Sequence, residues 1–366
     1  MVSQILHCHS DLTPHISVAK MSSLDNDIQN TRNDTPQISV SVSAVPGPSR
    51  RREEYTVGWI CALPIELAAA RAMLDERHKP LPQMANDSNV YEYGSMYGHN
   101  IVIACLPSGE YGIASATSVA KDMLRSFSIR VGLMVGIGGG IPKHGVHLGD
   151  VVISQPSGQL GGVVQYDFGK SITDGKFIRT GHLNSPTKAL LTALSSLRSD
   201  VEMYGSQSQK HINELARKYP IMKNAYASPE SLKDVVFKAE DEHGGSGNCE
   251  SCLSRFTPLR QSTGGRVREV HYGLIASGNQ VMKDAKRRDE ISNDMGENVL
   301  CFEMEAAGLM NDFPCLVIRG ICDYSDSHKN KEWQRYAAAT AAAEAKELLR
   351  HVATEEVLES PVSGRS

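Results

Sequence analysis

The stretch Val131-Gly132-Leu133-Met134-Val135-Gly136-Ile137-Gly138-Gly139-Gly140 decides the fold of this chain. Its first half is a short apolar run, which is typical of a buried strand. Its second half predicts a glycine-rich loop in which backbone N–H groups can approach a ligand closely. It is neither a dinucleotide fingerprint nor a P-loop, because Ile141-Pro142 follows instead of a helix and no Gly-Lys-Ser/Thr is present. Taken alone, the glycine run is equally consistent with a tight structural turn.

Strands and helices alternate on both sides of this stretch. Apolar or β-branched runs predict strands at 55–63, 90–97, 100–106, 150–154, 270–277, 299–302 and 315–321. Ala-rich or amphipathic segments predict helices at 65–76, 114–125, 185–197, from Glu305 onward and at 333–352. We therefore expect an α/β fold with a central, mostly parallel or mixed twisted sheet flanked by helices. Such sheets bind ligands beyond the carboxyl ends of their strands.

Composition indicates how the chain is divided. Residues 1–54 are rich in Ser, Thr, Asn, Asp and Pro and end in a basic cluster, which predicts a disordered N-terminal tail. A single domain is expected at 55–353, with a polar insertion at about 199–268 that is partly helical near 212–218. Residues 354–366 are predicted to form a second disordered tail.

Charge and hydropathy exclude several functions. Lys and Arg total 38 and Asp and Glu total 42, so the net charge is -4, which argues against a nucleic-acid partner. We expect no membrane span, since no run of about 18 apolar residues occurs, and no secretory signal. Most cysteines lie within apolar runs, which favours buried free thiols and a cytoplasmic location: Cys61, Cys105, Cys301, Cys315 and Cys322.

Acidic side chains follow two of the predicted strands. Glu303-Met304-Glu305 ends one strand, where a carboxylate can accept hydrogen bonds from the vicinal hydroxyls of a sugar. The alternative is that these acids stabilise a helix N-terminus. Asp323 ends another strand and can act as a general acid, or else cap the next segment.

The insertion contains a candidate metal site. His243, Cys249 and Cys252 have the spacing H-x5-C-x2-C, and three such ligands can hold a structural zinc with a fourth from elsewhere, for which His211 is a candidate. The alternative is a pair of solvent-exposed loop cysteines. No other cofactor is expected.

Six motifs in a fixed order carry a family resemblance: 55–66, 136–140, 149–152, 273–279, 302–308 and 319–323. Together they resemble the purine nucleoside and uridine phosphorylase superfamily, and within it the methylthioadenosine/S-adenosylhomocysteine nucleosidase branch. The chain is also similar to the fungal phosphorylase-like domains of NLR-type immune receptors. The resemblance runs from about 55 to 352 and is specific because the motifs occur as an ordered set.

The resemblance implies a mechanism. Asp323 matches the aspartate that protonates purine N7 as the glycosidic bond breaks. Glu305 matches the carboxylate that holds the ribose hydroxyls, Met304 packs beneath the sugar, and Glu303 is the first acid of that motif. Glu66 matches the nucleosidase carboxylate that activates water.

The resemblance also implies a substrate pocket. Gly138 and Gly139 belong to its glycine loop, and Val281 and Met282 fall where the family lines its purine slot. Trp333 stands where nucleosidases place an aromatic lid, or else is a core aromatic of the last helix. The expected partner is a small purine nucleoside or nucleotide, and family members are homo-oligomers.

Three functions remain open from the sequence. Ala62-Leu63-Pro64-Ile65-Glu66 replaces the Gly-Asp-Pro loop of phosphorylases, and Ile137 replaces a Ser or Thr, so hydrolysis is favoured over phosphorolysis. The alternatives are a phosphate-dependent phosphorylase and a non-catalytic module that senses nucleosides. Five side chains can meet a substrate phosphate or be surface charges: Lys283, Arg319, His328, Lys329 and Lys331.

Overall fold

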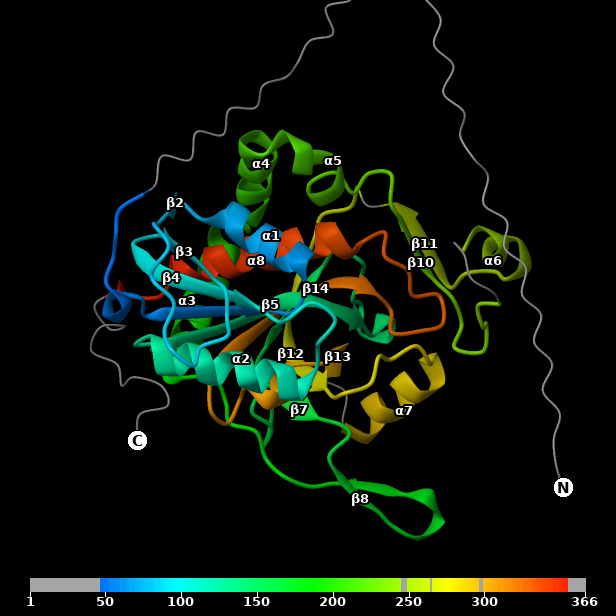
Figure 1. Ribbon diagram of the computed structural model, residues 1–366. Helices are drawn as coiled ribbons and strands as arrows, with labels where there is room; N and C mark the ends of the chain where they lie inside the picture. Colours follow the sequence, from blue (N-terminus) through cyan, green and yellow to red (C-terminus); the bar gives the residue numbers. More distant parts are fainter. Residues whose placement is uncertain (1–46, 245–248, 264, 296–298, 355–366) are drawn as a thin grey trace, which may run out of the picture. The chain divides into compact units, whose positions relative to one another are not determined.

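The structure is a computed structural model that describes residues 47–244, 249–263, 265–295 and 299–354 (Figure 1). Most of the two predicted tails, 1–46 and 355–366, lies outside the described residues. Regular structure runs from a 3-10 turn, η1 (Arg52–Glu54), to the long helix α8 (Gln334–Leu349).

Fourteen strands are found in the described part of the chain. Ten form one sheet: β1 (Val57–Cys61), β2 (Glu76–Arg77), β3 (Tyr91–Met96), β4 (His99–Cys105), β5 (Val131–Gly140), β6 (Val151–Ser154), β7 (Val163–Gln165), β12 (Val270–Ser277), β13 (Val299–Glu303) and β14 (Cys315–Asp323). The others form two hairpins: β8 (Gly169–Ser171) with β9 (Phe177–Arg179), and β10 (Lys233–Val236) with β11 (Arg260–Thr263).

Helices occupy both faces of the sheet. Besides α8 they are α1 (Pro64–Met73), α2 (Ile113–Ser126), α3 (Lys188–Tyr204), α4 (Ser208–Lys218), α5 (Lys223–Tyr226), α6 (Glu250–Arg255) and α7 (Ala285–Met295). α8 contacts β14 and β5 on one face, with α1, α3, α4 and α5 packed against it, and α2 contacts β1 and β4 (Figure 1). The α/β fold predicted from the sequence is therefore confirmed.

The sheet is mixed, as expected. Its order is β13-β12-β6-β14-β5-β1-β4-β3-β2, with β7 beside β12. β4, β1, β5 and β14 are parallel neighbours, whereas β14 and β6 are antiparallel. β13 also pairs with β5 in antiparallel fashion through Cys301 and Phe302, so the two strands meet beside the glycine run.

The glycine run is not a loop, which corrects the sequence interpretation. β5 continues to Gly140 because β14 pairs with it up to Gly139 and β13 pairs with its last two residues. Likewise, only a 3-10 turn, η5 (Ala306–Gly308), follows Glu305, and the predicted helix is absent there. Both segments depend on partners that are distant in sequence.

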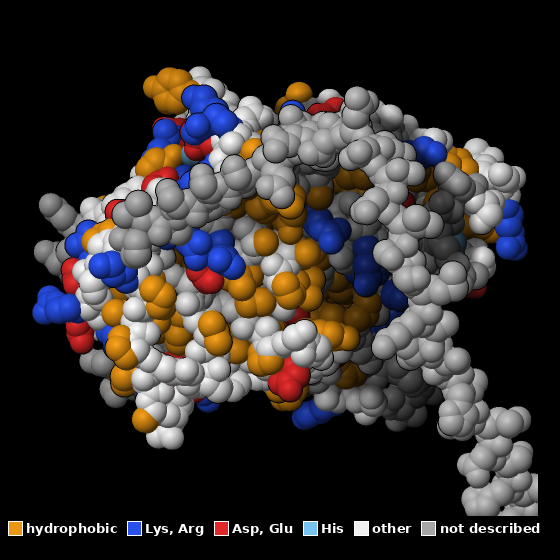
Figure 2. All heavy atoms as spheres, turned by 45° about the horizontal axis from the view of Figure 1, so that its top comes forward, with side chains coloured by type: hydrophobic (Ala, Val, Ile, Leu, Met, Phe, Trp, Pro, Cys, Tyr) orange, Lys and Arg blue, Asp and Glu red, His pale blue; other side chains and the backbone are white. Residues whose placement is uncertain are grey.

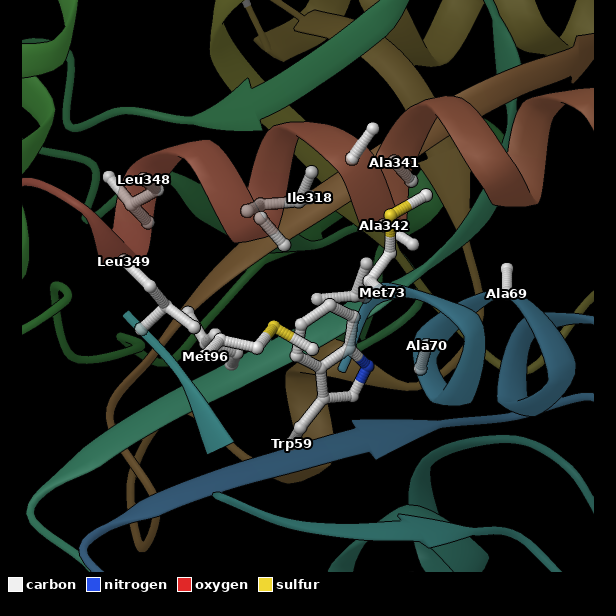
Figure 3. Packing of buried hydrophobic residues seen from close by; sticks show 14 of the residues in the cluster. Trp59, Ala69, Ala70, Met73, Met96, Ile318, Ala341, Ala342, Leu348 and Leu349 are labelled. Atoms are coloured by element: carbon white, nitrogen blue, oxygen red, sulfur yellow. The ribbon is translucent and has the colours of Figure 1, made fainter. Parts of the chain in front are cut away.

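The core on the α8 side is shown in Figure 3. Trp59 of β1 and Met73 of α1 lie between the sheet and α8, close to Ala341 and Ala342. Alanine side chains let the helix approach the sheet closely, and a Cβ at Gly320 would overlap the carbonyl oxygen of Ala337. This contact places β14, which carries Asp323 at its end.

On the face seen in Figure 2, Lys and Arg side chains form separate groups among apolar and acidic ones. The described helices include none that is both long and apolar enough to cross a membrane. The described cysteines are free, and those predicted to be buried are buried except Cys105, which is half-buried.

Candidate active site

A cavity of about 370 Å³ lies at the carboxyl ends of β5, β13 and β14. The start of α1 and the segment 280–282 complete its wall. Eight residues that the sequence predicts for the site line it: Glu66, Gly138, Gly139, Val281, Met282, Glu303, Met304 and Glu305. The fold thus gathers them from four segments into one place, where an open α/β sheet binds ligands.

Arg319 of β14 stands at the centre of the acidic side chains. It is 1% exposed, and its Nη2 donates to a carboxylate oxygen of Glu303 and lies 3.5 Å from Glu305 Oε2. Although burial opposes the charge, these carboxylates raise the pKa of Arg319. The interpretation of Arg319 as a surface charge is wrong, since the guanidinium neutralises buried carboxylates.

Glu66 is held at the start of α1. Its Oε2 accepts hydrogen bonds from the amides of Ala62 (2.7 Å) and Leu63 (2.9 Å), and its Oε1 accepts one from the amide of Ile137 (2.8 Å). Burial raises the pKa of Glu66, while the Arg319 guanidinium and these amides oppose the rise. The carboxylate is therefore fixed in orientation at the cavity wall.

The glycine run makes this arrangement sterically possible. A Cβ at Gly136 would lie 2.6 Å from both Glu66 Oε1 and Arg319 Nη1. A Cβ at Gly139 would lie 2.6 Å from Asp323 Oδ1 and would overlap Ser325. The backbone of β5 thus packs closely against Glu66, Arg319 and Asp323, and Gly138 and Gly139 also line the cavity, where the sequence predicted a close approach to a ligand.

Glu303 and Glu305 are bound differently, although they are neighbours in sequence. Glu303 accepts hydrogen bonds from the amides of Glu305 (3.1 Å) and Ala306 (3.0 Å), besides its contact with Arg319. Burial raises the pKa of Glu305 to about 7, against the opposing effect of Arg319. The carboxylate of Glu303 is thus occupied by partners within the protein, whereas the carboxylate of Glu305 can still accept hydrogen bonds from a ligand.

Asp323 does not line this cavity, although Cys322 and Ser325 on either side of it in the sequence do. It is 4% exposed and accepts hydrogen bonds from the amide of Ser325 (2.9 Å) and from Lys329 Nζ (2.6 Å). It lines a neighbouring cavity of about 240 Å³, on the side of the insertion, while Cys322 and Lys329 line both cavities. The ion pair of Lys329 with Asp323 therefore separates the two spaces.

Trp333 does not line the main cavity, so the interpretation as a lid is wrong. Its side chain is buried against Tyr336 and Cys322, and its Nε1 donates to the carbonyl oxygen of Lys233. The alternative, a core aromatic at the start of the last helix, holds.

Metal-ligating side chains meet beside the smaller cavity. His243, Cys252 and His328 place ligand atoms within 4.8 Å of one another, and Cys249 Sγ lies 4.0 Å from His243 Nδ1. His211 is not part of this cluster, because its Nε2 is paired with Glu347 at 2.9 Å. The spacing in the sequence predicted His243, Cys249 and Cys252 as metal ligands, whereas His328 was a candidate phosphate contact.

Further cavity residues were not singled out in the sequence. Tyr111 and Gln280 line the main cavity, and Ser325 adopts a left-handed backbone conformation (φ 53°) while its amide holds Asp323. A single polar residue in a loop carries no pattern that would reveal it. Its nearness to Asp323 in the sequence is the one signal that could have revealed Ser325.

Residues 56–355 match the model of the phosphorylase superfamily, and the chain belongs to this family. An NLR-like protein of Hyaloscypha variabilis is 48% identical over 311 residues, which cover 84% of this chain and 30% of that protein. This chain therefore spans less than a third of that relative.

Two other relatives are named as nucleosidases. The 5'-methylthioadenosine/S-adenosylhomocysteine nucleosidase of Mycobacterium tuberculosis is 26% identical over 309 residues, covering 81% of this chain and 96% of that protein. The ATP nucleosidase Cap17 of Escherichia coli is 23% identical over 302 residues, covering 80% and 50%.

Solved structures share the fold. The 5'-methylthioadenosine/S-adenosylhomocysteine nucleosidase of Streptococcus pneumoniae, solved with a transition-state inhibitor, superposes with a TM-score of 0.53 at 17% identity. The match covers 81% of this chain and 100% of that one.

Proposed function

We propose that this protein is an N-glycosidase that hydrolyses the bond between a purine base, adenine in the first place, and ribose. The observation that carries the proposal is the meeting of Glu66, Glu305 and Arg319 in one cavity wall, with Asp323 in the wall of the adjoining cavity. The similarity to two proteins named as nucleosidases supports the same reaction class.

Each acidic residue has a distinct role in the proposed reaction. Asp323 gives a proton to purine N7, so that the bond from N9 to C1′ can break with its electron pair leaving on the base. Glu305 accepts hydrogen bonds from the ribose hydroxyls while C1′ becomes oxocarbenium-like. Water then attacks C1′ and transfers a proton to Glu66, which yields free base and ribose.

Lys329 must change its contact before Asp323 can act as an acid. Its ammonium lies 2.6 Å from Asp323 Oδ2, and although burial opposes the charge, Asp323 raises the pKa of Lys329. In the proposal, the incoming base displaces the Lys329 ammonium from Asp323, and Asp323 takes a proton from solvent that it then gives to N7.

Hydrolysis is favoured over phosphorolysis by the charge of the cavity wall. Glu66, Glu303 and Glu305 surround the guanidinium of Arg319, so a phosphate dianion at this wall would meet more negative than positive charge. Water faces no such repulsion, and the orientation of Glu66 leaves it able to accept a proton.

The 5′ group of the substrate is the open part of the proposal. Lys331 lines the same cavity as Lys329 and can meet a 5′-phosphate chain, in line with the similarity to a protein named as an ATP nucleosidase. Tyr111 and Val281 instead offer exposed apolar surface at the cavity for a smaller 5′ substituent.

We also propose a homo-oligomer in the cytoplasm. Tyr111 and Val281 are 56% and 45% exposed at the cavity, and a neighbouring subunit would cover them. The buried free thiols suit a reducing compartment. Light scattering coupled to size-exclusion chromatography tests the oligomer, and a single-chain mass would contradict it.

Base release tests the proposed function. Purified protein is incubated with adenosine, methylthioadenosine, AMP and ATP, with and without phosphate, and the products are separated by chromatography. Adenine release without phosphate is expected. Release only with phosphate, together with ribose 1-phosphate, would instead identify a phosphorylase, and binding without release would identify a sensing module.

A further inference from the structure

Four metal-ligating side chains, none of which takes part in the proposed reaction, lie where the insertion meets the loop after Asp323. His243 Nδ1 lies 3.0 Å from Cys252 Sγ and 4.0 Å from Cys249 Sγ, and His328 joins the cluster from the other side. We propose that His243, Cys249, Cys252 and His328 form a structural zinc site. The metal would tie the insertion to the loop that carries Lys329.

The distances suit tetrahedral zinc. With Zn–N bonds of about 2.0–2.1 Å and Zn–S bonds of about 2.3 Å, ligand atoms lie roughly 3.4–3.8 Å apart. The 3.0 Å and 4.0 Å separations around His243 Nδ1 bracket this range. His243, Cys252 and His328 already place their ligand atoms within 4.8 Å of one another, and Cys249 would complete the set by rotation of its side chain. Two imidazoles and two thiolates are typical zinc ligands, and two thiolates balance the charge of Zn²⁺.

His328 provides an independent indication of a ligand. It is 8% exposed, and its Nε2 has no hydrogen-bond partner among the described residues. Phe237 stacks on the imidazole with ring centroids 4.1 Å apart and an angle of 21° between the planes, which fixes the ring. Buried polar nitrogen atoms are normally satisfied, and a bound metal would satisfy this one.

The remaining contacts bring the same two segments together. The amide of His243 donates to Ser327 Oγ at 2.9 Å, and Cys249 Sγ lies 3.5 Å from the carbonyl oxygen of His328. A Cys249–Cys252 disulfide would need neither histidine, and both thiols are free in the structure. The cluster is therefore better explained by a metal than by an oxidised pair.

The proposed metal is linked to the candidate active site through one peptide bond. His328 directly precedes Lys329, whose ammonium holds Asp323 at 2.6 Å. The small cavity between them is lined by Cys249, Asp323 and Lys329. The zinc would thus act as a positioning element for the loop, without contact with the substrate.

Metal analysis tests the proposal. The full chain, free of any histidine tag, is purified without chelator and its metal content is measured by plasma mass spectrometry. About one zinc per chain is expected, falling about tenfold or more in Cys252→Ser and His328→Ala. The control Cys105→Ser changes a half-buried thiol elsewhere and should retain the metal. Metal-free protein after dialysis against zinc, full zinc retention in His328→Ala, or a Cys249–Cys252 disulfide in mass spectra would each overturn the site.

A second measurement keeps the test valid if a variant fails to fold. The wild-type protein is loaded with Co²⁺, whose intense visible bands are expected to report tetrahedral coordination with thiolate ligands. Removing the metal with a chelator should speed limited proteolysis within the insertion, and zinc should restore protection. Weak Co²⁺ bands typical of octahedral coordination, or a proteolysis rate that is the same with and without metal, would contradict the proposal. Neither readout depends on base release, so this inference and the proposed function can fail separately.

Discussion

Replacing Arg319 by methionine should destabilise the protein in a pH-dependent way. Arg319 is 1% exposed and is the cation beside Glu303, Glu305 and Glu66. Methionine keeps most of the apolar volume but removes the charge. The carboxylates must then stay buried without a partner or take up protons.

The expected size follows from the cost of protonation. Glu66 has an ordinary pKa of 4.5. A pH of about 7.5 is about 3 units above this pKa, so keeping Glu66 protonated there costs about 4 kcal/mol. At about pH 5 the same proton costs about 0.7 kcal/mol. Leaving a buried charge unpaired instead costs about 3–5 kcal/mol, so the variant should lose about 3–4 kcal/mol near neutral pH. The loss shrinks on acidification, because protonation is what the variant needs.

Urea unfolding at the two pH values measures this difference from the midpoint and slope of each transition. Arg287→Met is the matched control, because Arg287 forms an exposed ion pair with Glu290 and should change the free energy of unfolding by at most about 1 kcal/mol. A stable Arg319→Met protein near neutral pH, or an equal loss at both pH values, would refute the assignment of Arg319 as the partner of the buried carboxylates.

Three further predictions concern the cavity. Glu66→Gln should lower kcat for base release by about 10²- to 10⁴-fold with a small change in KM, since a general base is lost; unchanged kcat would remove Glu66 from the mechanism. Because burial raises the pKa of Glu305 to about 7 and its ionised form accepts the ribose hydrogen bonds, the pH profile of kcat/KM should contain a rising limb centred at about pH 7. The pH profile of Glu305→Gln should lack this limb, and its persistence would assign the limb to another group. Gly139→Ala places a Cβ 2.6 Å from Asp323 Oδ1, so activity should fall by at least about tenfold while the circular dichroism spectrum is kept, and full activity would contradict the close packing of β5.

The sequence was a good guide to segments that form their structure from their own pattern. β1 and α1 appear where an apolar β-branched run and a Pro-initiated, Ala-rich run predict them. Eight predicted site residues also line one cavity. Six of them stand at the end of a strand or the start of a helix, and Val281 and Met282 lie in the loop between β12 and α7. Parallel strands bring such ends together.

The sequence could not predict features that depend on distant partners. The glycine run is a strand because β13 and β14 pair with it, and neither pairing has a local signal. In the sequence Arg319 is a single charge within an apolar strand, and its carboxylate partners on α1 and after β13 are known only from the fold. His328 joins His243 only because the insertion folds back onto the loop after β14.

The most direct test of the account compares wild-type protein with Asp323→Asn in phosphate-free buffer, with adenine release followed over time. The wild type should release adenine without phosphate and the variant should be about 10²- to 10⁴-fold slower, since asparagine cannot give a proton to purine N7. Equal rates for the two proteins, or release that begins only when phosphate is added, would contradict the proposed reaction.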